Sequence, residues 1–365
     1  MSTHSQDATL PQEGVPWLEP WPTDQLEVLG QCPVCGSNSR EILHADLVDN
    51  TFFCAPGIWK MFSCKTCFSA YLDPRPTPLS IGLAYTRYYT HDQGDEKFDY
   101  VNLGLVRRIR RQLVNGYTNW RFGTKAEPSH PLGILAAFLV PGMRAQLATE
   151  YRNLPKKSPK GSKVLDIGCG DAAFLELARN CGWEVVGVDP DPRAVVVAQA
   201  RGLDVRQGGL EIFNEQAEVF DIITLNNVVE HLHDPGAVLG ACHRLLKPGG
   251  HIWLDTPNID SPGHRFFGAN WRGLETPRHL VLFNHTSLVR LLMNAGFQKL
   301  KIMPHRNVYQ GMFRMSQSMR TCYAPESYQP LPFTLRVRAV LAWCSGCLHL
   351  NRREFLTFSV IKKGK

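Results

Sequence analysis

The sequence predicts an α/β protein whose main domain is a doubly wound, Rossmann-like sheet of seven strands. From Lys163 onward, short apolar stretches alternate with helical stretches, which is typical of parallel strands joined by crossover helices. Glycine or polar residues follow these strands, at the edge where ligands bind in such sheets. The predicted strands are 163–167, 184–189, 203–206, 220–226, 251–255, 299–303 and 355–361.

The composition favours an ordinary folded protein and excludes few partners. The chain has 365 residues, 44% hydrophobic and 20% charged, with a net charge of +7. That charge suits a phosphate-bearing ligand, nucleic acid or an anionic membrane surface without selecting among them. The first residues, MSTHSQDATLPQEG, lack the pattern of a secretory signal. We therefore expect a cytoplasmic protein, and peripheral membrane contact stays an open alternative.

Cysteine spacing predicts a structural metal site near the start of the chain. Two C-x2-C pairs, Cys32/Cys35 and Cys64/Cys67, can each hold Zn²⁺ from a tight turn. Four thiolates close a tetrahedral site and leave no position for a catalytic water, so we expect a zinc knuckle or ribbon that is structural. The alternative to a metal site is that the four cysteines are unrelated buried thiols. A further pair, Cys344/Cys347, lies in an apolar stretch that predicts a buried helix, and we interpret it as packing.

The first strand of the alternating region runs into a glycine turn that favours S-adenosylmethionine over a dinucleotide. Asp166, Gly168 and Gly170 form the pattern D-x-G-x-G, without the third glycine that packs against a pyrophosphate. The aspartate would repel a diphosphate but can serve the ammonium of an amino acid. Asp189 ends the second strand, where a carboxylate can bind two ribose hydroxyls. Asn226 ends the fourth strand at the same edge.

Four successive motifs resemble those of class I S-adenosylmethionine-dependent methyltransferases over residues 163–300. They are VLDIGCGDAAFL, EVVGVDPD, FDIITLNNVVEHLHDP and LLKPGGHIWLDTPN. The resemblance implies that Gly168 and Gly170 approach the methionine part, that Asp189 binds the ribose, and that Gly208 and Gly209 face the adenine. The chain departs from the family at Ala172, where a further glycine is common.

The N-terminal region has a narrower resemblance. Its two C-x2-C pairs and the segment LDPRPTP (72–78) resemble a bacterial subset of these enzymes with a zinc-binding N-terminal region. Members of that subset act on sugars, polysaccharides and natural products, which implies a small-molecule or glycan acceptor. The run NWRGLETPRHLVLF (270–283) is similar to one in the same subset.

Methylation of an oxygen or carbon acid needs a group that removes a proton, and histidine or a carboxylate is suited to it. The candidates for catalysis are Glu230 and His231, after the fourth strand, and His279, in the loop 270–283. In that loop we expect Trp271 and Phe283 to anchor the chain, and Arg278 and His279 to face the acceptor.

The predicted organisation has four parts: a polar tail at 1–30, the zinc-binding region at 31–80, a helical connecting or cap region at 81–160, and the methyltransferase domain at 161–365 with a helical insertion at 306–350. The expected activity is methyl transfer to an oxygen or carbon of a small molecule, sugar or lipid-linked polysaccharide. The alternative is an RNA methyltransferase that grips RNA with the zinc region and the basic helix around residues 106–113. The absence of an N-P-P-Y motif at Asn226 and the modest charge argue against nucleic acid.

Overall fold

The computed structural model describes residues 19–86, 104–140, 142–156, 161–304, 307–321 and 330–364. Most of the predicted polar tail lies outside these ranges.

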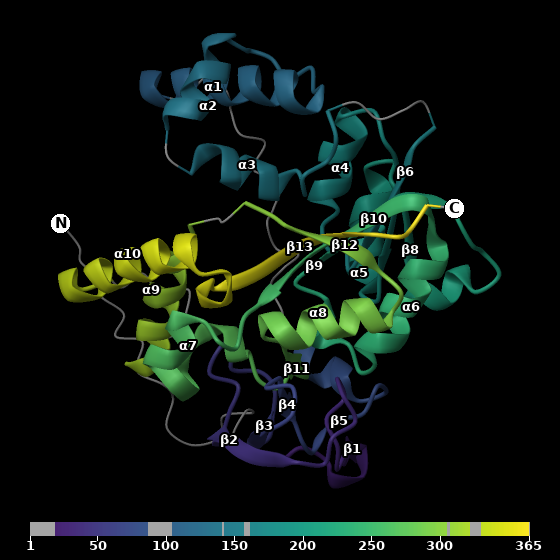
Figure 1. The fold of residues 1–365 in the computed structure, drawn as a ribbon, viewed down its shortest axis with the longest axis vertical. Helices are drawn as coiled ribbons and strands as arrows, with labels where there is room; N and C mark the ends of the chain where they lie inside the picture. The colour runs from purple at the N-terminus through teal and green to yellow at the C-terminus, as the bar shows by residue number, and fades with distance from the viewer. Residues whose placement is uncertain are drawn as a thin grey trace.

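The predicted seven-stranded sheet is confirmed, and it is mixed, not purely parallel. Its order is β12-β13-β10-β9-β6-β7-β8, and the five strands from β10 to β8 pair in parallel (Figure 1). Strand β13 runs antiparallel to both β10 and β12. The strands are β6 (Lys163–Ile167), β7 (Glu184–Asp189), β8 (Asp204–Gln207), β9 (Phe220–Asn226), β10 (Leu246–Pro257), β12 (Gln298–Ile302) and β13 (Phe355–Ile361).

Alternate side chains of the central strands enter two different cores, because successive residues of a strand point to opposite faces. Leu165 and Ile223 belong to the larger core, which also holds residues of α6 and α8. Val164 and Ile222 belong to the smaller core, with residues of α4 and α5. These helices are α4 (Ala173–Asn180), α5 (Pro192–Ala200), α6 (Pro235–Leu245) and α8 (His285–Asn294).

Three further helices pack together, with α9 in contact with the other two: α7 (Pro262–Phe267), α9 (Tyr309–Arg320) and α10 (Phe333–Leu348). Helix α10 contains Cys344 and Cys347, as expected, but both thiols are exposed. The expectation that this pair is buried packing was wrong, because α10 buries only a narrow stripe that includes Ala339, Ala342 and Gly346.

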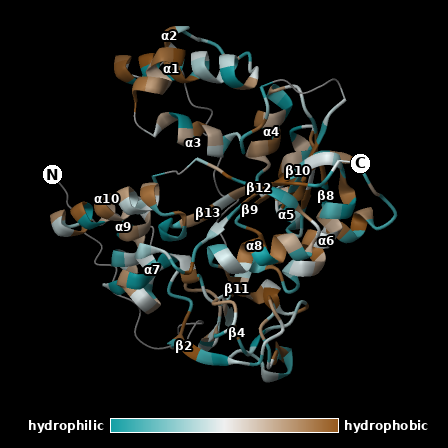
Figure 2. Ribbon diagram, in the orientation of Figure 1, coloured by the Kyte–Doolittle hydropathy of each residue, from teal (hydrophilic) through white to brown (hydrophobic). Residues whose placement is uncertain are grey.

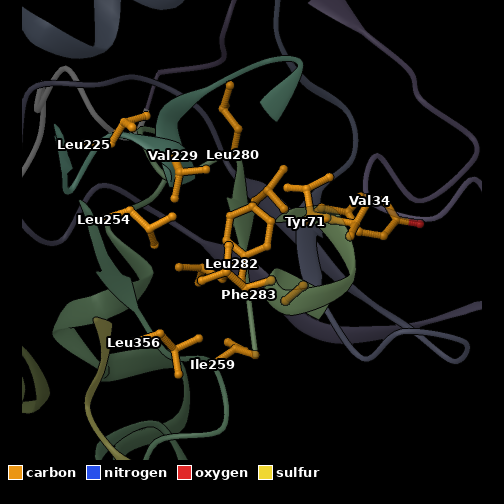
Figure 3. Packing of buried hydrophobic residues seen from close by; sticks show 14 of the residues in the cluster. Val34, Tyr71, Leu225, Val229, Leu254, Ile259, Leu280, Leu282, Phe283 and Leu356 are labelled. Carbon is orange, nitrogen blue, oxygen red and sulfur yellow. The ribbon is translucent and has the colours of Figure 1, made fainter. Parts of the chain in front are cut away.

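The predicted zinc-binding region, residues 31–80, is built into the main core through a shared sheet. Strand β11 (Val281–Leu282), from the loop 270–283, pairs with β4 (Ala70–Leu72), giving the sheet order β11-β4-β3-β2. The remaining strands are β2 (Arg40–Leu47), β3 (Trp59–Cys64) and the small pair β1 (Leu26–Glu27) with β5 (Arg75–Pro76). Figure 3 shows Tyr71 of β4 packed beside Leu282 and Phe283, in the same cluster as Leu225 and Leu254 of the main sheet.

A helical cap occupies the opposite end of the molecule from the zinc-binding region (Figure 1). It consists of α1 (Leu105–Phe122), α2 (Leu132–Leu139) and α3 (Met143–Glu150), and it packs on the smaller core, where Phe122 stacks on Tyr151 at 4.3 Å between ring centroids. Within the described ranges no single helix is long and apolar enough to cross a membrane. Helices α2 and α3 pass that test only as a pair bent by 110°.

Candidate active site

The four predicted zinc ligands lie together, as the spacing predicts. The Sγ atoms of Cys32 and Cys67 are 3.6 Å apart, as are those of Cys35 and Cys64. A tetrahedral zinc with Zn–S bonds of about 2.3 Å requires sulfur separations of roughly 3.8 Å. The two turns also match in their backbone hydrogen bonds, because Gly36 N–H donates to the Cys32 carbonyl and Phe68 N–H to the Cys64 carbonyl. The residues therefore fit a closed, four-thiolate zinc site.

The glycine turn and Asp189 form one hydrogen-bonded unit at the ends of β6 and β7. The Gly170 N–H donates to one carboxylate oxygen of Asp189 at 2.8 Å, and the Asp191 N–H donates to the other at 2.9 Å. Gly168 adopts φ +64°, and a Cβ there would come within 2.8 Å of Val228. The turn is therefore fixed by sterics, and the Asp189 carboxylate, which can accept further hydrogen bonds, is held in place.

Asp166 lies beneath this turn with a partner that the sequence analysis did not identify. Its carboxylate is fully buried, is ion-paired with the Arg152 guanidinium and accepts a hydrogen bond from the Thr224 hydroxyl. Arg152 follows α3, with φ +45°, and its guanidinium also lies 3.9 Å from the centroid of the Phe174 ring. No periodicity or motif marks Arg152, so only the fold reveals this pair.

The remaining predicted cofactor residues lie along the same edge. Gly208 and Gly209 directly follow β8, and both are half-buried. The Gly208 N–H donates to the Asp189 carbonyl, which ties this turn to the ribose-side carboxylate. Asn226 is the last residue of β9 and is also half-buried. The structure therefore brings the predicted cofactor residues to one edge of the sheet.

The loop 270–283 is held by buried anchors, as expected. Trp271 and Phe283 are both fully buried, and the indole N–H of Trp271 donates to Glu354 at 3.2 Å. A Cβ at Gly273 would come within 2.3 Å of the Trp271 ring, so only glycine fits beside it. The loop is therefore a rigid part of the site.

The expectation that Arg278 faces the acceptor was wrong. Its guanidinium is fully buried and forms two hydrogen bonds to the Asp49 carboxylate, at 2.9 and 2.7 Å. Asp49 also accepts hydrogen bonds from the backbone amides of residues 51, 52, 54 and 55. Burial raises the pKa of Asp49, but Arg278 and these amides outweigh it and leave that pKa lowered. The pair joins the loop to the zinc-binding region, a contact over more than two hundred residues of sequence that no local pattern predicts.

The three predicted catalytic residues do come together. The imidazole rings of His231 and His279 meet edge to face, 4.7 Å between centroids, and His279 Nε2 lies 4.0 Å from Glu230 Oε1. Glu275, which the sequence analysis did not place in the site, lies 3.8 Å from the same Nε2 atom and is ion-paired with Arg272.

Hydrogen-bond partners fix the tautomer of each imidazole. His279 Nδ1 lies 2.8 Å from the Gly273 carbonyl, and His231 Nδ1 lies 3.0 Å from the Arg278 carbonyl and from the Tyr85 hydroxyl. A carbonyl oxygen can only accept, so Nδ1 carries the proton in both rings. Nε2 is therefore the basic atom of each.

Burial controls the charges of this cluster. It lowers the pKa of His231, lowers that of His279 to about 3 and raises that of Glu230 to about 8. Burial also raises the pKa of Glu275, but Arg272 and the nearby imidazoles outweigh it and lower that pKa to about 2. At neutral pH both imidazoles are therefore neutral, Glu275 is a carboxylate and Glu230 is largely protonated.

His231 differs from its two neighbours in access. It is half-buried, whereas His279 is 4% exposed and Glu230 is fully buried. Glu230 Oε2 accepts a hydrogen bond from Thr256 at 2.9 Å, while Oε1 has no hydrogen-bond partner among the described residues. His231 is therefore the member of the cluster best placed to meet a ligand.

The strand order, the glycine turn and the acidic end of β7 define a class I methyltransferase fold. Residues 142–302 match the family model described as a methyltransferase domain. The chain therefore contains an S-adenosylmethionine-dependent methyltransferase domain of class I, and the match leaves the zinc-binding region outside it.

Curated relatives match about a third of the chain. The ubiquinone biosynthesis O-methyltransferase of Pseudomonas aeruginosa is 38% identical over 113 residues, covering 29% of this chain and 49% of the relative. Its counterpart in Cereibacter sphaeroides is 38% identical over 136 residues, covering 34% and 55%. The chain spans about half the length of the curated relatives it matches.

A solved structure of phosphoethanolamine N-methyltransferase 2 from Haemonchus contortus, in complex with S-adenosyl-L-methionine, is 17% identical. It covers 68% of this chain and 60% of that one, with a TM-score of 0.42. This likeness assigns no acceptor.

Proposed function

We propose that the protein transfers a methyl group from S-adenosylmethionine to an oxygen or carbon of a small molecule, sugar or lipid-linked polysaccharide. The observation that carries the proposal is the neutral, half-buried His231 next to the end of β9, in the same edge of the sheet as the glycine turn and Asp189. The curated relatives, named as O-methyltransferases, support an oxygen acceptor.

In the proposed mechanism the residues of the chain hold the reactants and move one proton. Asp189 binds the ribose hydroxyls, Gly168 and Gly170 admit the methionine part, and Gly208 and Gly209 face the adenine. S-adenosylmethionine supplies an activated methyl group on a sulfonium. His231 Nε2 would accept the proton that the acceptor loses as its new bond to the methyl carbon forms and the bond from that carbon to sulfur breaks. His279 packs edge to face against the His231 ring and is the alternative proton acceptor, whereas Glu230 lies beside His279 and already holds a proton at neutral pH.

We also propose that Cys32, Cys35, Cys64 and Cys67 hold a structural Zn²⁺. Its support is the sulfur geometry given above. All four positions of a tetrahedral ion are taken by thiolates, so the metal takes no part in methyl transfer.

The test is label transfer from S-adenosyl-[methyl-³H]methionine into glycan, lipid, small-metabolite and RNA fractions. We expect label outside the RNA fraction, and label in RNA alone would contradict the proposed acceptor. With the acceptor fraction found, His231→Asn should lower turnover by roughly 10²- to 10⁴-fold, the usual contribution of a general base, and leave cofactor binding by calorimetry unchanged.

Two further variants serve as the positive and the negative control for that result. Asp189→Ala should lose both cofactor binding and turnover, while His349→Asn, a change at an exposed histidine after α10, should alter neither. Full turnover in His231→Asn with a fall in His279→Ala would move the role of base to His279.

A further inference from the structure

Helices α1 and α2 form a rigid hairpin, residues 105–139, at the end of the molecule far from the zinc-binding region (Figure 1). The two helices touch through glycine. A Cβ at Gly116 would lie 1.9 Å from the His130 carbonyl oxygen, and one at Gly133 would lie 1.9 Å from that of Leu113. Because the backbones are in contact, the hairpin presents its outer side chains as one surface.

The outer face of this hairpin is apolar. Leu132, Leu135, Phe138 and Leu139 of α2 are each more than half exposed, at helical spacing. Figure 2 shows the strongly apolar colouring of α2 at this end of the molecule. At the start of α1, Leu105, Val106 and Ile109 are exposed as well. Contiguous exposed apolar side chains of this kind mark a binding surface.

Basic side chains lie on α1, beside α2, and on α3. Arg107, Arg108 and Arg110 are exposed on α1, and the Arg144 guanidinium of α3 lies 4.3 Å from the centroid of the exposed Phe138 ring. A cavity of about 900 Å³ lies between α1, α3 and α4. Its charged lining residues are Arg107, Arg110, Arg111, Lys125, Glu127 and Glu150.

We propose that the hairpin docks on the surface of an anionic phospholipid bilayer. The apolar face of α2 enters the boundary between headgroups and acyl chains, and the arginines of α1 meet the lipid phosphates. A bilayer satisfies both features at once, whereas RNA would pair with the arginines and leave the apolar face in water. This proposal goes beyond the methyl transfer proposed above and does not depend on it.

The test is co-sedimentation of the full chain with vesicles of phosphatidylcholine alone or mixed with phosphatidylglycerol. We expect binding to the mixed vesicles that weakens as salt rises, because salt screens the arginine–phosphate attraction. Arg107→Gln/Arg110→Gln should lower the partition coefficient on the order of thirtyfold, at about fivefold for each basic side chain near an anionic surface. Leu135→Ser/Phe138→Ser/Leu139→Ser should abolish measurable binding.

Matched controls distinguish binding through this surface from non-specific binding to vesicles. Phe333→Ser/Leu341→Ser removes exposed apolar residues from α10, and Arg193→Gln/Arg206→Gln removes two arginines from the region of α5 and β8. Both should bind vesicles within about twofold of the wild type. Thermal unfolding of each variant verifies that it is folded.

Several results would overturn the proposal: vesicle binding kept by the hairpin variants, binding lost in the α10 control instead, or equal binding to vesicles with and without phosphatidylglycerol. Release of the bound protein by millimolar inorganic phosphate at constant ionic strength would also overturn it, because the cavity would then recognise free phosphate and not a bilayer.

Discussion

The zinc-binding region and the α1–α2 hairpin are both additions to the same sheet, yet they are attached in opposite ways. The zinc-binding region shares a sheet with the loop 270–283 through the β4–β11 pairing and shares its hydrophobic core with the main domain (Figure 3). The hairpin shares no strand with the sheet and contributes few residues to the smaller core.

This difference in attachment determines which part of the molecule each region can affect. The zinc-binding region also contacts Asn284, directly after the loop, whose side-chain amide donates to the Cys67 and Phe68 carbonyls. The position of His279 therefore depends on the folding of the cysteine turns. The hairpin instead leaves its apolar side exposed, which suits attachment of the protein to a membrane more than a role in catalysis.

The largest expected effect is loss of the metal. We expect the wild type to contain a single zinc ion per chain by elemental analysis, and Cys64→Ser to lose it. Structural zinc contributes on the order of 10 kcal/mol to the folding of small zinc-binding peptides. The variant should therefore show a marked fall in melting temperature and in turnover, since β4 supports β11.

The matched control is Cys347→Ser, in the exposed C-x2-C pair of α10, which should keep both zinc and turnover. A metal-free wild type with normal stability would contradict the zinc assignment and remove this half of the comparison.

The next effect in size comes from the ion pair between the two regions. Asp49→Asn leaves the buried Arg278 charge without its carboxylate, and we expect a loss of about 3–5 kcal/mol in the free energy of unfolding in urea. Glu41→Gln is the control. It breaks the exposed pair with Lys65 in the same region and should cost less than about 1 kcal/mol.

Asp49→Asn and Glu41→Gln with equal unfolding free energies would show that the pair does not join the regions. A second unfolding transition in Asp49→Asn, absent from the wild type, would show that breaking the pair uncouples them.

The effect that is smallest per pH unit is a pH dependence of stability from Glu230. Burial raises its folded pKa to about 8, above the value near 4.3 of an unfolded chain, so the folded state binds the proton more tightly. The contribution of Glu230 to the free energy of unfolding is fully present below pH 4 and is lost as the pH rises toward 8. Between pH 5 and 8 the loss approaches 1.4 kcal/mol per pH unit.

The measurement compares the free energy of unfolding of the wild type with that of Glu230→Gln across this pH range. Only the wild type should lose the contribution of Glu230 as the pH rises. Glu354, whose pKa burial raises to about 7, contributes to both proteins and cancels in the difference. Parallel pH profiles of the two proteins would contradict a protonated Glu230.

Local patterns predicted the parts of the site that lie within one segment. The glycine turn, Asp189 and the cysteine pairs each depend on short spacings and were placed correctly relative to their strands or turns. The partners of Asp166 and Arg278 were not predicted. Arg152 and Asp49 come from segments with no motif, and their pairing depends on burial, which no single segment reveals.

By itself the sequence determined the order of strands along the chain, the edge of the sheet that carries the glycine turn, and the four thiolates. These follow from periodicity and spacing, which act over a few residues. Only the tertiary structure decided that Arg278 forms a buried ion pair and does not face the methyl acceptor. It also decided that His231 is more accessible than His279. It also decided which addition shares the core. Those outcomes depend on packing between segments far apart in the chain, and packing sets exposure, charge and therefore chemistry.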